Sequence, residues 1–132
     1  SAKCSVDIRV FTLEEREEIV KKIERIVNHS YIQGTTSSMR IIGEFRPFVK
    51  TAESNALYEL YKATAQEVGF HVGEQFSGGC ADSGITSSLG CVTLCATGPV
   101  GGKPHTVEEY CEINTFIPRA TAIIKTIAQL AN

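Results

Sequence analysis

The sequence has 132 residues and a formal net charge of -2, with 42% hydrophobic and 21% charged residues. This balance is ordinary for a soluble globular protein, and the length allows one domain or two small half-domains. Lysine and arginine are spread along the chain, so nothing indicates a nucleic-acid partner. No apolar run approaches ~18 residues, which argues against a membrane-spanning helix. The first residues also lack the apolar region of a signal peptide.

The cysteines give no sign of a metal site. There are five of them, and they are Cys4, Cys80, Cys91, Cys95 and Cys111. Their spacing is irregular and no CxxC pair occurs, whereas a structural zinc site uses paired cysteines at short spacing. Cys91 and Cys95 lie in an apolar run typical of a buried strand, so we expect buried thiols. A reducing, cytoplasmic compartment is expected.

The N-terminal third predicts a strand, a helix and a second strand. Apolar and polar residues alternate over 5–10, which predicts a half-buried strand. Apolar residues then recur at helical spacing over 13–28, and Thr12 precedes them as the N-cap of a capping box. After a polar stretch, residues 39–45 predict another strand, which Pro47 ends because proline cannot continue a ladder.

The rest of the chain predicts three helices and two strands. They are expected at 54–68, 70–75, 82–89, 91–96 and 115–130. Gly69 stands where a left-handed residue ends a helix, and Pro118 lies in the first turn of the last helix. A glycine-rich loop that we expect to be flexible separates the last strand from the last helix. Alternating strands and helices predict an α/β fold.

Three segments could carry chemistry. His105 lies in a glycine-rich loop close to acidic residues, so it could be a metal ligand or a general acid or base. Arg46, at a strand end, could bind a carboxylate in bidentate fashion. The turn over 77–82 could present backbone N–H groups to an anion. Each also has an ordinary structural interpretation, respectively a solvated histidine, a surface ion pair and a turn capped by Asp82.

Taken in order, five segments match a known pattern. Residues 6–10 resemble a V-D-x-R strand, 46–47 a strand-end Arg-Pro, and 77–82 a T/S-G-G-x-x-D turn. Residues 98–110 resemble a G-P…H-x-x-x-E-Y segment, and 113–120 the start of a terminal helix. These motifs are those of the glutamate carboxypeptidase/aminoacylase family, which includes acetylornithine deacetylase. Each motif is weak alone, but five in the correct order are specific.

The resemblance implies a fold. Residues 1–46 would be the remainder of a ferredoxin-like lid, or dimerisation domain, with the order strand, helix, strand. Residues 47–132 would be the C-terminal part of a zinc-exopeptidase α/β catalytic domain. The chain is similar to the lid and catalytic parts of an enzyme that cleaves amide bonds, acting as an exopeptidase or as an N-acyl amino acid deacylase.

The resemblance also implies site residues. His105 would be a zinc ligand, and Arg46 would bind the free carboxylate of a small-molecule or peptide substrate. Ser77, Gly78 and Gly79 would line the substrate pocket. No catalytic residue is expected in this chain, because the family's other metal ligands and its general base belong to motifs that this sequence lacks. The complete site would hold two zinc ions, and the site in this chain would be incomplete.

These expectations make the chain a fragment. It would need the N-terminal half of the same enzyme, would form a homodimer, and would not hydrolyse amides by itself. Glu109 would orient His105 or the neighbouring loop, and Cys80 departs from relatives with a third glycine. Two alternatives stay open: a non-catalytic dimerisation or assembly module of the same family, and a self-contained α/β domain with a thiol-based site at Cys80 and His105.

Overall fold

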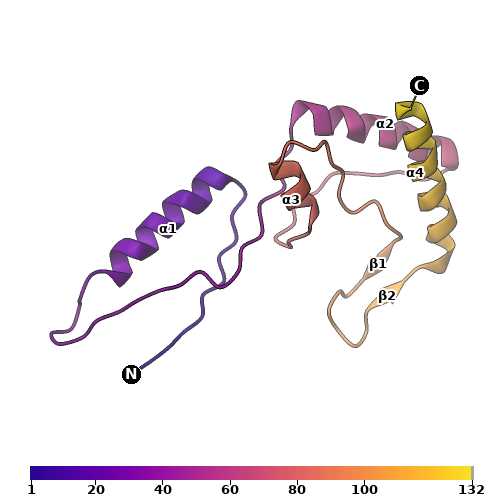
Figure 1. Cartoon of the computed structure of the whole chain (residues 1–132). Helices are drawn as coiled ribbons and strands as arrows, with labels where there is room; N and C mark the ends of the chain where they lie inside the picture. The colour runs from indigo at the N-terminus through magenta and orange to yellow at the C-terminus, as the bar shows by residue number, and fades with distance from the viewer. Residues whose placement is uncertain (132) are drawn as a thin grey trace. The chain divides into compact units, whose positions relative to one another are not determined.

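A computed structural model describes residues 1–131 and divides the chain into two compact units (Figure 1). The first unit is Ser1–Val49 with Ser77–Cys91, and the second is Lys50–Phe76 with Val92–Asn132. The predicted boundary after residue 46 lies near the first of these divisions. The turn over 77–82 and the helix after it, which we expected in the second part, lie in the first unit.

The fold combines helices with one small antiparallel sheet, in agreement with an α/β class in its general sense. In chain order, the elements are α1 (Leu13–Val27), α2 (Ala52–Val68), α3 (Ser83–Ser88), β1 (Gly101–Gly102), β2 (Tyr110–Cys111), the 3-10 helix η1 (Ile113–Thr115) and α4 (Phe116–Leu130). All four predicted α-helices are therefore confirmed, and each predicted boundary lies within two residues of the observed one.

The predicted strands at 5–10, 39–45, 70–75 and 91–96 are wrong. Among residues 1–131, none of these segments forms a ladder with another segment, and the only sheet pairs β1 with β2. An extended segment becomes a strand only when a second segment meets its backbone hydrogen-bonding groups. The strand–helix–strand order of a ferredoxin-like lid is thus present only as a helix between two unpaired segments.

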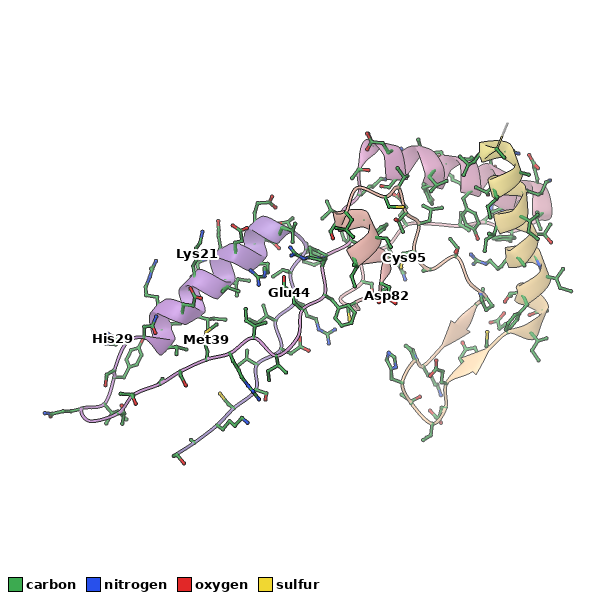
Figure 2. The ribbon with its side chains drawn as sticks, viewed as in Figure 1. Lys21, His29, Met39, Glu44, Asp82 and Cys95 are labelled. Carbon is green, nitrogen blue, oxygen red and sulfur yellow. The ribbon has the colours of Figure 1, made fainter. Side chains whose placement is uncertain are left out.

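In the first unit, α1 begins as its sequence predicts. The Thr12 hydroxyl accepts the Glu15 N–H at 3.1 Å, and the Glu15 carboxylate accepts the Phe11 N–H at 2.9 Å. Lys21 points away from the segment that carries Met39 and Glu44 (Figure 2). Even so, no residue of α1 is buried. The helix is therefore stabilised by its cap and by partial contacts rather than by a closed core.

In the second unit, α2 and α4 cross and bury the residues between them (Figure 1). Ala65, Thr64 and Ala122 are completely buried, and Tyr61 and Thr126 nearly so. The Thr64 and Thr126 hydroxyls lie 2.8 Å apart. Small side chains at the crossing let the two backbones approach closely, and the paired hydroxyls avoid the cost of burying polar groups without partners.

The ends of α2 also follow from its sequence. Thr51 and Ser54 exchange side-chain hydrogen bonds with each other's backbone N–H groups in a capping box. A backbone hydrogen bond and the Thr51 side chain lower the pKa of Glu53 at this helix start. Gly69 ends the helix with φ 101°, the left-handed conformation that glycine adopts most easily.

Much of the apolar surface stays exposed. The accessible surface is 10584 Å² for 14.3 kDa, whereas two separate compact globules of half this mass would expose about 8,200 Å² together. The exposed large apolar side chains include Val6, Ile42 and Ile117, at 72%, 75% and 79%. The accessible surface above the value for two compact globules therefore arises within the units, and it does not depend on how they are arranged. Such apolar surface is typical of an interaction site.

The cysteines differ from the prediction as well. All five are exposed, including Cys91 and Cys95, which we expected to be buried. Their segment belongs to no sheet within residues 1–131, so it is not the buried strand that we expected. No described helix is long and apolar enough to cross a membrane.

We predict that Ala122→Leu destabilises the second unit by about 1–3 kcal/mol, because the added atoms overpack the crossing of α2 and α4. Urea denaturation followed by circular dichroism measures this change. Ala120→Leu, on an exposed position of the same helix, is the control and should change stability by less than about 0.5 kcal/mol. Equal effects of the two substitutions would contradict the described packing.

Candidate functional site

A short hairpin presents His105. Gly101 pairs with Cys111 and Gly102 with Tyr110 in antiparallel register, and His105 lies in the loop between them. The sequence predicted a flexible loop in this position and missed the hairpin. The sequence signal that could have indicated it was the pair Gly101 and Gly102, followed within the length of a hairpin loop by the aromatic residue Tyr110.

The two glycines are required by the close approach of Tyr110. A Cβ on Gly101 would lie 2.5 Å from the Tyr110 carbonyl oxygen, and one on Gly102 would lie 2.7 Å from the Tyr110 ring. Both distances are shorter than carbon contacts allow. A larger residue at Gly101 would displace the Tyr110 backbone, and one at Gly102 would displace the Tyr110 side chain. The glycines therefore permit the narrow hairpin that holds the His105 loop.

Hydrogen bonds attach this hairpin to the start of α4. The Glu112 N–H donates to the Val100 carbonyl at 2.8 Å, and the Val100 N–H donates to the Thr115 hydroxyl at 2.9 Å. The Thr115 hydroxyl donates in turn to the Glu112 carbonyl at 2.6 Å. Through these contacts the hairpin is fixed to the helix that packs against α2.

His105 itself has an unusual backbone. Its φ is 66°, in the left-handed region that residues other than glycine seldom adopt. Its backbone N–H donates to the Glu109 carboxylate at 3.0 Å. The His105 side chain is exposed, so its imidazole is accessible to a metal ion or to a substrate.

The described residues do not assemble a metal site by themselves. Across residues 1–131, no three histidine, cysteine or acidic side chains come together as metal ligands. A catalytic zinc uses about three protein ligands. His105 has the right chemistry for one of them.

Arg46 lies in the first unit against α3. A Cβ on Gly84 would lie 2.0 Å from the Arg46 carbonyl oxygen, so only glycine allows α3 to pack there. The Arg46 side chain is 49% exposed and its Nε lies 3.9 Å from Glu44. Glu44 pairs more closely with Arg16, at 2.6 Å. The Arg46 guanidinium is therefore held near an acid but keeps an accessible face for a carboxylate.

The turn over 77–79 is in the same unit and is exposed. The Gly79 N–H donates to the Ser77 hydroxyl at 3.1 Å, and the Gly78 carbonyl accepts a hydrogen bond from Arg9 at 2.9 Å. Asp82 precedes α3 but makes no side-chain cap. Arg9 is the residue that the sequence argument missed here: its place in a V-D-x-R pattern was visible, but its partner was not.

The predicted site residues are therefore divided between the units. Arg46 and the Ser77–Gly79 turn belong to the first unit, and His105 belongs to the second. The thiol-based alternative has the same property, because Cys80 lies in the first unit.

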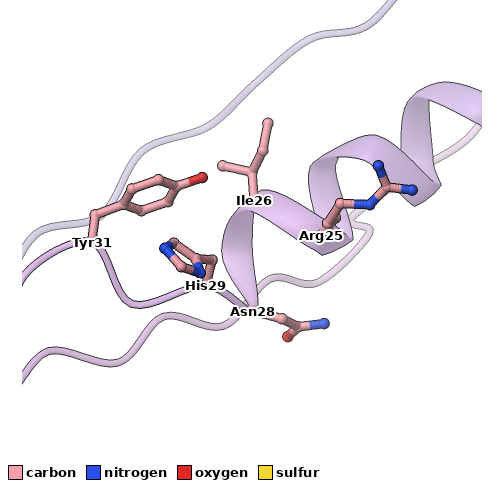
Figure 3. A pocket seen from close by; sticks show the side chains of 5 residues that line it. All are labelled: Arg25, Ile26, Asn28, His29 and Tyr31. Atoms are coloured by element: carbon pink, nitrogen blue, oxygen red, sulfur yellow. The ribbon is translucent and has the colours of Figure 1, made fainter.

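A surface hollow elsewhere contains none of these residues. It lies at the C-terminal end of α1 and is lined by Arg25, Ile26, Asn28, His29 and Tyr31 (Figure 3). The His29 and Tyr31 rings meet edge to face, with centroids 4.5 Å apart.

Comparisons with known proteins add no assignment. No protein-family model matches the sequence, no curated protein matches it, and no solved structure matches the fold.

We predict that Gly84→Ala displaces the backbone at Arg46 and destabilises the first unit by about 1–3 kcal/mol, because its Cβ would overlap the Arg46 carbonyl. Backbone NMR shifts near Arg46, together with denaturation, measure both effects. Gly43→Ala is the control, because a Cβ there meets nothing within 4 Å. Unchanged shifts in Gly84→Ala would contradict the packing of α3.

Proposed function

We propose that the chain is the C-terminal part of a zinc-dependent amide hydrolase, acting on substrates with a free carboxylate. The observation that carries this proposal is His105: an exposed imidazole on a narrow hairpin, with a left-handed backbone. Unfavourable backbone conformations persist where surrounding structure enforces them, and they concentrate at functional sites. The ordered motifs of the glutamate carboxypeptidase/aminoacylase family supply the reaction class.

In this proposal, His105 contributes one ligand and the rest of the enzyme contributes the others. Zinc bound in the completed site would lower the pKa of a water molecule and polarise the amide carbonyl. This chain supplies no general base. Its own contributions are to hold an imidazole in place and to bind the substrate.

Arg46 would select the substrate. A guanidinium matches the two oxygens of a carboxylate in bidentate fashion. Its 3.9 Å separation from Glu44 leaves it weakly paired, since Glu44 contacts Arg16 more closely. The Ser77–Gly79 turn, fixed by Arg9, would form part of the pocket wall.

The exposed apolar surface favours a second candidate, a non-catalytic assembly module of the same family. The helix α1 buries no residue, and the segments on either side of it belong to no sheet within residues 1–131. Such surface would be covered by a second copy or by the missing part of the enzyme. The two candidates differ in one respect: only the hydrolase requires the chemistry of His105.

We predict that the full-length protein binds zinc and hydrolyses an N-acyl amino acid or a dipeptide, whereas the 132-residue chain does neither. In the full-length protein, His105→Ala should reduce zinc affinity by more than the 10- to 100-fold that loss of an outer partner costs. Metal analysis and amide hydrolysis assays measure these effects.

The control for this experiment is His71→Ala, because His71 is exposed and lies outside the hairpin. Turnover by the isolated chain, or tight zinc binding by it through His105, would show that the ligand count is wrong. Zinc binding and activity that survive His105→Ala in the full-length protein would reject the proposed ligand and favour the assembly module.

We also predict that Arg46→Ala in the full-length protein raises KM by about 10- to 100-fold for substrates with a free carboxylate, the loss expected for a hydrogen bond to a charged group. The effect should disappear for amidated substrate analogues, which lack that charge. Arg40→Ala, at a nearby exposed position, is the matched control. Identical kinetics in Arg46→Ala and Arg40→Ala would remove Arg46 from the site.

A further inference from the structure

The loop between β1 and β2 holds two residues in the left-handed region. The φ angles of Lys103 and His105 are 55° and 66°. Neither residue is glycine, so the loop would not keep this conformation without compensating contacts. The contacts that provide this compensation decide where the His105 imidazole points.

Backbone and hydroxyl contacts close the first part of the loop. Thr106 donates to the Lys103 carbonyl through its N–H at 3.3 Å and through its hydroxyl at 2.8 Å. The Glu109 N–H donates to the Thr106 carbonyl at 3.2 Å. These bonds shape the turn around His105, but none of them involves His105 itself.

Among the hydrogen bonds described for residues 1–131, the one that His105 makes is with Glu109. A Glu109 carboxylate oxygen accepts the His105 backbone N–H at 3.0 Å. A hydrogen bond to a charged acceptor is stronger than one between neutral groups. It acts on the backbone of the strained residue, so it fixes the direction of the Cα–Cβ bond and leaves the imidazole accessible.

We propose that Glu109 is a positioning residue, which holds His105 in its left-handed conformation so that its imidazole projects in one direction. Its relevance to zinc rests on the proposed function of His105 as a ligand. Glu109 touches neither metal nor substrate in this scheme. A prepositioned imidazole binds a metal more tightly, because less conformational freedom is lost on binding.

An adjacent ion pair offers a competing explanation and a matched control. Glu108 pairs with Lys103 at 2.7 Å across the same loop, and both side chains are largely exposed. If general stiffness of the loop held His105 in its left-handed conformation, removing the Lys103–Glu108 ion pair would loosen His105 as much as removing Glu109 does. Exposed ion pairs contribute little to stability, so the proposal assigns the effect to Glu109 alone.

The first test measures the His105 amide in the 132-residue chain by NMR hydrogen exchange. Exchange at His105 should accelerate at least about tenfold in Glu109→Ala, the loss expected for a hydrogen bond to a charged group. It should accelerate less in Glu109→Gln, which keeps a neutral acceptor. Glu108→Ala and Glu108→Gln should leave it unchanged.

The Glu112 amide, which donates to Val100, reports whether the hairpin remains closed. The exchange rate of the His105 amide is therefore compared with that of the Glu112 amide in each variant. If the Ala variants open the hairpin, the comparison is made on the Gln variants. A His105 rate that is unchanged by Glu109→Gln, or equally changed by Glu108→Gln, overturns the proposal.

A second measurement connects the contact to the metal. In the full-length protein, Glu109→Ala should weaken zinc affinity by about 10- to 100-fold, as loss of an outer partner does, and Glu108→Ala should not. If His105→Ala leaves zinc affinity intact, the proposed ligand role fails, while the exchange result still decides whether Glu109 positions His105. The two failures are therefore distinguishable.

Discussion

The crossing of α2 and α4 is the contact on which the second unit depends. It holds the fully buried side chains of that unit, and the Thr64 and Thr126 hydroxyls satisfy each other inside it. The hairpin is joined to the start of α4 through Glu112 and Thr115. The position of the His105 loop therefore depends on small residues of α2 and α4 that lie about forty positions before it and about twenty positions after it along the chain. A change at this crossing would move the loop without touching it.

The helices could be predicted from the sequence because their signals are local. Thr12, Gly69 and Pro118 mark helix ends through interactions within a few residues, and each has the predicted position in the structure. The strands could not be predicted in the same way. Alternating apolar residues show that a segment could occupy a half-buried strand, but the partner strand lies elsewhere in the chain or outside it. None of the four segments predicted to be strands belongs to a sheet within residues 1–131.

The same distinction applies to the candidate site. Residue type and spacing identified His105, Arg46 and the turn at Ser77, because their chemistry is visible in the sequence. The contacts that hold them were not predicted. Arg9 reaches Gly78 across 69 residues, and Gly84 meets the Arg46 carbonyl across 38 residues (84 − 46). Even the bond between His105 and Glu109 depends on a left-handed backbone, which the sequence around His105 gives no direct reason to expect.

The exposed apolar surface and the ligand count together restrict how the proposed site could be completed. A second copy of this chain could cover apolar surface, and homodimers commonly do so through identical patches. However, that copy would add a second His105 and would lack the family's other ligand motifs as the first copy does. Two imidazoles fall short of the roughly three protein ligands of one catalytic zinc, and further short of two zinc ions. In the proposed hydrolase, the remaining ligands and the base belong to family motifs that these 132 residues lack, so a second copy of the same sequence would not supply those motifs.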